Sequence, residues 1–146
     1  MCGDCDCLSH LLRTNVGDKT IRDAGQLLLI GSCMKKRYPD IVEKIRVSDG
    51  DKALLHVCLE ETHMNHAGYK IASMIRYANL SSITALTIDG SPHCVQLHYL
   101  IDDIKRHFIP EVETRHFVVE KGEIVEISSS AIKHSRHLSK IEKIIS

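Results

Sequence analysis

The stretch Ala53-Leu54-Leu55-His56-Val57-Cys58-Leu59 is nearly apolar throughout, and the run from Ile83 to Ile88 has the same character. Segments that are apolar on both faces are typical of central strands in a parallel sheet. Residues 63–79 lie between the two runs and carry apolar side chains at helical spacing, and residues 92–108 do so after the second run. Strands that alternate with helices in this way predict an α/β domain with right-handed crossovers.

The chain before and after this unit predicts three more helices. Asp18 is suited to cap a helix that begins near residue 19, and apolar side chains recur at roughly helical spacing over residues 19–30. Pro39 suits the first turn of a helix over residues 39–46. Residues 128–144 begin with serines that can cap a helix and combine an apolar face with a basic one.

A hairpin completes the expected fold. Residues 115–120 and 123–127 read as strands on either side of a glycine-containing turn, which adds one antiparallel edge strand. We therefore expect a mostly parallel sheet of three or four strands with helices on both faces. Residues 1–18 are predicted to form a Cys-rich N-terminal extension, and residues 19–146 a single α/β domain.

Composition restricts the function. The 146 residues carry 19 Lys and Arg against 19 Asp and Glu, so there is no basic excess of the kind that a non-specific nucleic-acid binder needs. No apolar run is long enough to span a membrane, and the N-terminus has neither the basic nor the apolar part of a secretory signal. We expect a cytoplasmic protein that binds neither nucleic acid nor membrane, and homo-oligomers are possible.

Soft metal ligands and acids follow both predicted strands. Cys58 and His63 come after the first strand, and Asp89, His93 and Cys94 come after the second. Ligands bind outside the carboxyl ends of the strands in open α/β sheets, so these five side chains could meet in one cleft. The pattern favours a metal, cluster or thiol site.

The position of Cys94 is the sharpest local feature. Ser91 and Pro92 are strong helix-start signals, which puts Cys94 near free backbone N–H groups that favour a thiolate. His98 lies four residues further on the same helix face, a spacing that can hold zinc. His56, two residues before Cys58, is expected to be a core histidine rather than a ligand.

The N-terminal cysteines form a second candidate group. Cys2, Cys5 and Cys7 lie within six residues and could wrap a soft metal ion or part of an iron–sulfur cluster, with Cys33 as a possible fourth ligand. Their spacing matches neither a bacterial ferredoxin nor paired zinc knuckles. Zinc and an iron–sulfur cluster therefore both stay open.

Three functions are compatible with these residues. The first is a metal- or iron–sulfur-binding protein with a redox or electron-transfer accessory role and a redox protein partner; its ligands would come from Cys58, Cys94, Cys33, His63, His93 and His98. The second is a metal-free thiol enzyme with Cys94 as nucleophile and His93, His63 or Asp89 as base. The third is a non-catalytic binding or regulatory module. No phosphate loop, dinucleotide fingerprint or Gly-x-Ser-x-Gly elbow is present.

Overall fold

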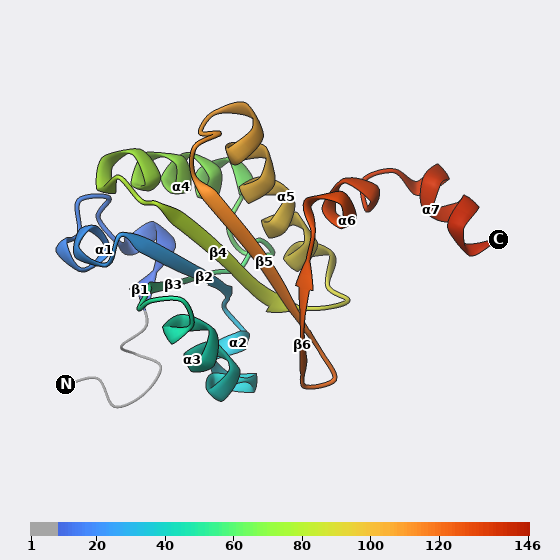
Figure 1. The fold of residues 1–146 in the computed structure, drawn as a ribbon, viewed down its shortest axis with the longest axis horizontal. Helices are drawn as coiled ribbons and strands as arrows, with labels where there is room; N and C mark the ends of the chain where they lie inside the picture. The colour runs from blue at the N-terminus through green and yellow to red at the C-terminus, as the bar shows by residue number, and fades with distance from the viewer. Residues whose placement is uncertain (1–8) are drawn as a thin grey trace.

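The apolar runs lie in the middle of a six-stranded sheet (Figure 1). The computed structural model describes residues 9–146. In chain order the strands are β1 (Ser9–His10), β2 (Gln26–Gly31), β3 (Ala53–Val57), β4 (Ser82–Ile88), β5 (Glu113–Glu120) and β6 (Glu123–Ile127). Their spatial order is β1-β3-β2-β4-β5-β6, and all neighbours are parallel except β5 and β6. The mostly parallel sheet with one antiparallel edge pair is confirmed, with six strands rather than three or four.

Helices pack on both faces of the sheet, as predicted. One face carries η2 (Leu11–Arg13), α1 (Lys19–Ala24), α4 (Met64–Ala78) and α5 (Pro92–His107), and the other carries α2 (Met34–Arg37) and α3 (Pro39–Val47). Alternation along β2 divides the core: Leu27 and Leu29 pack on the α4 and α5 side, and Leu28 and Ile30 on the α2 and α3 side. This central strand is therefore buried on both faces.

The helix predicted over residues 19–30 is wrong in its second half. Gly25 adopts a left-handed conformation with φ of 70° and ends α1, and its N–H donates to the carbonyl of Ile21. Residues 26–31 then form β2 between β3 and β4. A short, continuous apolar run does not distinguish a buried strand from a helix, and here pairing with two distant strands decides the outcome.

The single C-terminal helix predicted over residues 128–144 is also wrong. It is divided into α6 (Ser129–His134) and α7 (Leu138–Ile145). At the break, Ser135 Oγ donates to the carbonyl of Ile132 and contacts Tyr99 Oη on α5 at 3.1 Å. Contacts with α5 thus interrupt a pattern that is helical when taken alone.

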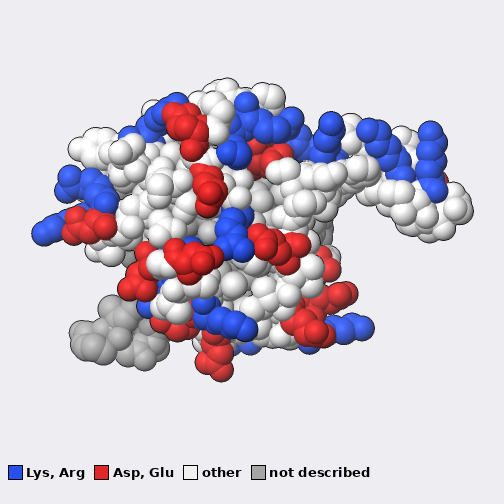
Figure 2. Space-filling model, viewed as in Figure 1, with Lys and Arg blue, Asp and Glu red and all other residues white. Residues whose placement is uncertain are grey.

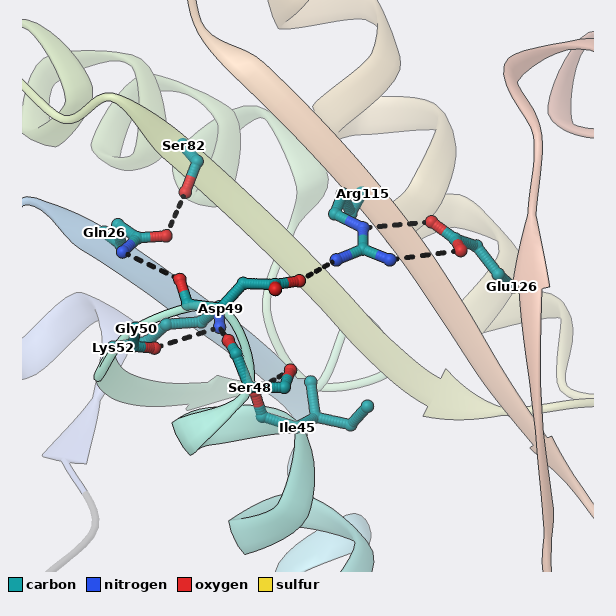
Figure 3. A network of polar contacts seen from close by, with 9 residues as sticks. All are labelled: Gln26, Ile45, Ser48, Asp49, Gly50, Lys52, Ser82, Arg115 and Glu126. Atoms are coloured by element: carbon teal, nitrogen blue, oxygen red, sulfur yellow. Dashed lines mark hydrogen bonds and ion pairs between the residues drawn. The ribbon is translucent and has the colours of Figure 1, made fainter.

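A polar network closes the amino edge of the sheet (Figure 3). Arg115 on β5 forms ion pairs with Asp49 at 2.7 Å and with Glu126 on β6 at 3.0 Å. Gln26 on β2 donates to the backbone carbonyl of Asp49 and accepts from Ser82 on β4. The turn after α3 is therefore tied to four strands, at the edge opposite the candidate site.

Charged side chains of both signs are interspersed over the visible face of the molecule, as expected for equal numbers of acidic and basic residues (Figure 2). Within residues 9–146, no helix combines the length and the apolar character that crossing a membrane requires.

Candidate functional site

The connections around β2 create a crevice at the carboxyl edge of the sheet. The chain leaves β2 toward β3 on one side and then crosses back over β2 to reach β4 on the other. In open α/β sheets such a reversal separates the loops that follow the central strands, and ligands bind between them. A cavity of about 210 Å³ lies there, lined by residues from the loops after β2, β3 and β4.

Each of these three loops brings one cysteine to the cavity. Cys33 immediately precedes α2, Cys58 follows β3, and Cys94 is the third residue of α5. A Cβ placed on Gly31 would stand 3.8 Å from Cys94 Sγ, so the glycine keeps this wall of the cavity open. All three thiols are free. The N-terminal candidates Cys2, Cys5 and Cys7 lie outside the described residues.

The other strand-end candidates are divided between different places. His93 lines the same cavity. His63 is exposed, and its Nδ1 caps α4 by accepting from the backbone N–H of Asn65 at 3.1 Å. Asp89 and His98 line a second, smaller cavity of about 140 Å³. Of the five side chains expected to share one cleft, the structure brings together both cysteines and one histidine.

The arrangement of the thiols restricts what the cavity can hold. Among residues 9–146, no three His, Cys, Asp or Glu side chains are arranged to hold a single metal ion. The cysteines instead line a cavity whose volume is several times that of an ion. This geometry does not match the four converging ligands of one tetrahedral zinc ion.

The other two thiols of the cavity act electrostatically on Cys33. Partial burial raises the pKa of Cys33, and the neighbouring thiols of Cys94 and Cys58 raise it further, against a smaller lowering influence from Arg37. Cys33 is therefore a neutral thiol at pH 7 when no metal ion is bound in the cavity. A bound metal centre would reverse this, because a metal deprotonates the thiols that coordinate it.

A hydrogen-bonded group flanks the cavity on the β3 side. His56 is half-buried rather than a core residue, and burial, followed by the charge of Lys35, lowers its pKa to about 4. Lys35 Nζ lies 3.5 Å from His56 Nε2, and Ser32 Oγ lies 2.8 Å from His56 Nδ1. An ammonium group has only donors, so Nε2 accepts from it and the Nδ1 proton is donated to Ser32. The hydroxyl proton of Ser32, which lines the cavity, stays available to a ligand.

Sequence reasoning missed Ser32, Lys35 and Arg37. All three follow β2, the strand that helical periodicity concealed. Arg37 also lines the cavity, which therefore has a cationic side chain on the same wall as Cys33. The signal that could have found them is the Gly31-Ser32 pair at the end of an aliphatic run, a pattern that is typical of a strand followed by a loop.

The placement of His98 excludes it from the cysteine cavity. It is 4% exposed, and its Nε2 lies 2.9 Å from the hydroxyl of Thr87, which lines the cavity. Its Nδ1 contacts His116 Nδ1 on β5 at 2.9 Å. The two rings form a buried pair behind Thr87, so the Cys94 and His98 zinc clasp expected from their spacing is not formed.

The comparisons with known proteins agree with this architecture. A family model described as a Rossmann-like domain matches residues 20–145. No curated protein and no solved structure gives a significant match. The match covers most of the chain, and a crevice where the strand order reverses is the feature that this fold uses for ligands. The chain therefore belongs to the Rossmann-like domain family.

Proposed function

We propose that the protein binds an iron–sulfur cluster or a related polynuclear soft-metal centre in the cysteine cavity and has a redox or electron-transfer accessory role. The observation that carries the proposal is the convergence of Cys33, Cys58 and Cys94, which come from three different loops, on one cavity at the reversal of the strand order. Thiolates are the ligands that iron–sulfur clusters use.

The size of the cavity favours a cluster over a single ion. Three thiols line a volume of about 210 Å³, and within residues 9–146 no three His, Cys, Asp or Glu side chains are arranged to hold one metal ion. A cluster spreads its ligands around several metal atoms, so it can be held by side chains from separate loops. A structural zinc ion needs four ligands at about 2.0–2.3 Å from one centre.

The surroundings of the thiols support an anionic centre. Arg37 lines the cavity, Ser32 can donate its hydroxyl proton, and the positive end of the α5 dipole lies at the helix start, where Pro92 has no N–H and the N–H of Cys94 donates to Ser91 Oγ. Hydrogen bonds and positive charge near the sulfurs stabilise thiolates and adjust the potential of a cluster. His93, which also lines the cavity, is our candidate for a fourth ligand, and Cys2, Cys5 and Cys7 remain candidates from sequence alone.

A second candidate function is a metal-free thiol enzyme. It is favoured by the position of Cys94 in the first turn of a 16-residue helix, beside His93 and in the wall of a ligand-sized cavity. Cys94 would be the nucleophile and His93 the base. Asp89 does not line this cavity, so it is a weaker candidate than it is from sequence.

Metal and sulfide analysis of protein purified without oxygen distinguishes the cluster-binding protein from the thiol enzyme. With a cluster, we expect iron, acid-labile sulfide and a broad absorption near roughly 400 nm. A triple Cys33→Ser, Cys58→Ser, Cys94→Ser variant should lose this signal. A matched Cys2→Ser, Cys5→Ser, Cys7→Ser variant should keep the iron and sulfide that the cavity binds.

Retention of all iron by the first triple variant would refute the cavity as the site. Metal-free wild-type protein in which Cys94 alone reacts rapidly with iodoacetamide would favour the thiol enzyme instead. Since free thiols need a reducing compartment, we also propose a cytoplasmic location and a redox protein as partner.

A further inference from the structure

The last helix exposes a row of aliphatic side chains. Leu138, Ile144 and Ile145 of α7 are 79%, 71% and 74% exposed, and no residue of the helix is buried. Ile141 lies on the same face by helical spacing. In Figure 1, α7 extends away from the sheet beyond α6. An eight-residue helix is marginal in water without packing, so this face indicates a partner surface.

The turn before α7 holds the helix away from the body of its own chain. Arg136 forms an ion pair with Asp103 on α5 at 2.6 Å, and its guanidinium group lies 4.8 Å from the ring centre of Tyr99. Ser135 also contacts Tyr99 Oη. These contacts fix where α7 begins, and from there α7 extends away from α4 and the sheet (Figure 1).

An apolar groove of matching size lies between α4 and α5 beside the Arg136–Asp103 ion pair, and Asp103 is one of its lining residues. It has a volume of about 420 Å³ and runs between α4 and α5. Its walls include Met64, Tyr69, Ala72, Leu100, Ile104 and Phe108. Tyr69 and Phe108 are 80% and 67% exposed at its rim. The α4 wall from Met64 to Ala72 spans about 12 Å, which is also the length of an eight-residue helix.

We propose that α7 of one copy lies in the α4–α5 groove of a second copy, and that the exchange is mutual in a two-fold symmetric dimer. A helix that lays its apolar face into an apolar groove is a recurring mode of recognition, and exchange of one element between two copies closes the assembly. Lys140 and Lys143 would then stay on the solvent side of the helix.

The buried area is compatible with a reversible dimer. A helix about 12 Å long and about 11 Å wide buries roughly 200 Å² on each side when half of its surface is covered. Symmetry supplies two such contacts, and the total of about 800 Å² is below the roughly 1,000 Å² of a stable interface and typical of a weak, transient one. The dimer should therefore dissociate on dilution.

The test measures the mass of the full chain by light scattering and sedimentation over a range of concentrations. We expect a concentration-dependent dimer for the wild type. Ile144→Glu should place a charge on the apolar face of α7, and Phe108→Glu should place one at the rim of the groove. Each variant should raise the dissociation constant of the dimer at least ten-fold. The control is Tyr77→Glu, because Tyr77 is exposed on α4 but does not line the groove.

Mixing Ile144→Glu with Phe108→Glu distinguishes a lost α7–groove contact from a loss of folding. Ile144→Glu keeps its groove and Phe108→Glu keeps its helix, so the mixture can form one of the two contacts and should recover part of the dimer. A wild type that is monomeric at all concentrations would overturn the proposal. So would dimers unaffected by either variant, open polymers, or an α7 that binds anionic lipid vesicles while the protein stays monomeric.

Discussion

His98 Nδ1 lies 2.9 Å from His116 Nδ1, in the interior between α5 and β5. Burial lowers the pKa of His98 to about 3 and that of His116 to about 4. Both rings are therefore neutral at pH 7, with one shared proton between the two Nδ1 atoms. His116 Nε2 is the one buried side-chain nitrogen or oxygen atom in the described part of the chain without a hydrogen-bond partner.

This pair should make the protein sensitive to acid. An unfolded histidine has a pKa near 6.5, so below that pH the unfolded state binds protons that the folded pair does not. The stabilising contribution is complete above pH 6.5 and is lost as the pH falls toward 4. We expect the free energy of unfolding to drop by about 1 to 3 kcal/mol per pH unit in this window, measured by urea denaturation.

Replacing the pair tests its part in this slope. His98→Leu combined with His116→Leu should reduce the slope between pH 6.5 and 4 and leave the smaller part that His56 contributes in the same window, whatever the effect at pH 7. The matched control replaces His66 and His107, which are both exposed, by leucine and should keep the wild-type slope. An unchanged slope in the buried double variant would contradict the assignment.

The cavity can be narrowed without disturbing the fold. Gly31 does not have a positive φ, and an added Cβ would meet Cys94 Sγ and Thr87 Cγ2 at ordinary contact distances of 3.8 and 3.9 Å. Gly31→Ala should therefore change stability by less than about 1 kcal/mol, and Gly31→Leu should also exclude the bound centre. Iron content and urea denaturation measure the two effects. Full iron in folded Gly31→Leu would place the centre elsewhere.

Cys33 should react slowly for an exposed thiol. Its pKa is raised by burial and then by Cys94 and Cys58, so little of it is thiolate at pH 7. In metal-free protein, iodoacetamide should modify Cys33 more slowly than an unstructured peptide thiol, as followed by peptide mass spectrometry. Cys58→Ser with Cys94→Ser should accelerate the reaction. An equal rate in that double variant would show that the three thiols do not interact.

Lys52 stabilises the turn at the opposite edge of the sheet. This side chain is buried, and its ammonium group donates to the backbone carbonyls of Ile45, Ser48 and Gly50 (Figure 3). Lys52→Met would remove this donor from the Ser48 and Gly50 carbonyls, whereas the Ile45 carbonyl would still accept from the N–H and the hydroxyl of Ser48. We expect a loss of about 1 to 3 kcal/mol in the free energy of unfolding. Lys44→Met, at an exposed position on α3, should have little effect.

Local signals predicted most of the architecture. Ser91 and Pro92 mark the start of α5, and Ser91 Oγ accepts from the backbone N–H of Cys94 as a cap should. The glycine turn after β5 is also where the sequence places it. Such features depend on residues within a few positions of one another, so they can be recognised before the fold is known.

The candidate site depended on contacts that no local pattern contains. The sequence determined that strands and helices alternate and that Cys58 and Cys94 follow strands. Only the tertiary structure decided that residues 26–31 form the strand between β3 and β4, which brings Cys33 to the same cavity. It also decided that His98 turns toward His116 and that α6 and α7 separate. The physical reason is that a strand is stabilised by neighbours far away in the chain, whereas helix starts and turns are stabilised by nearby residues.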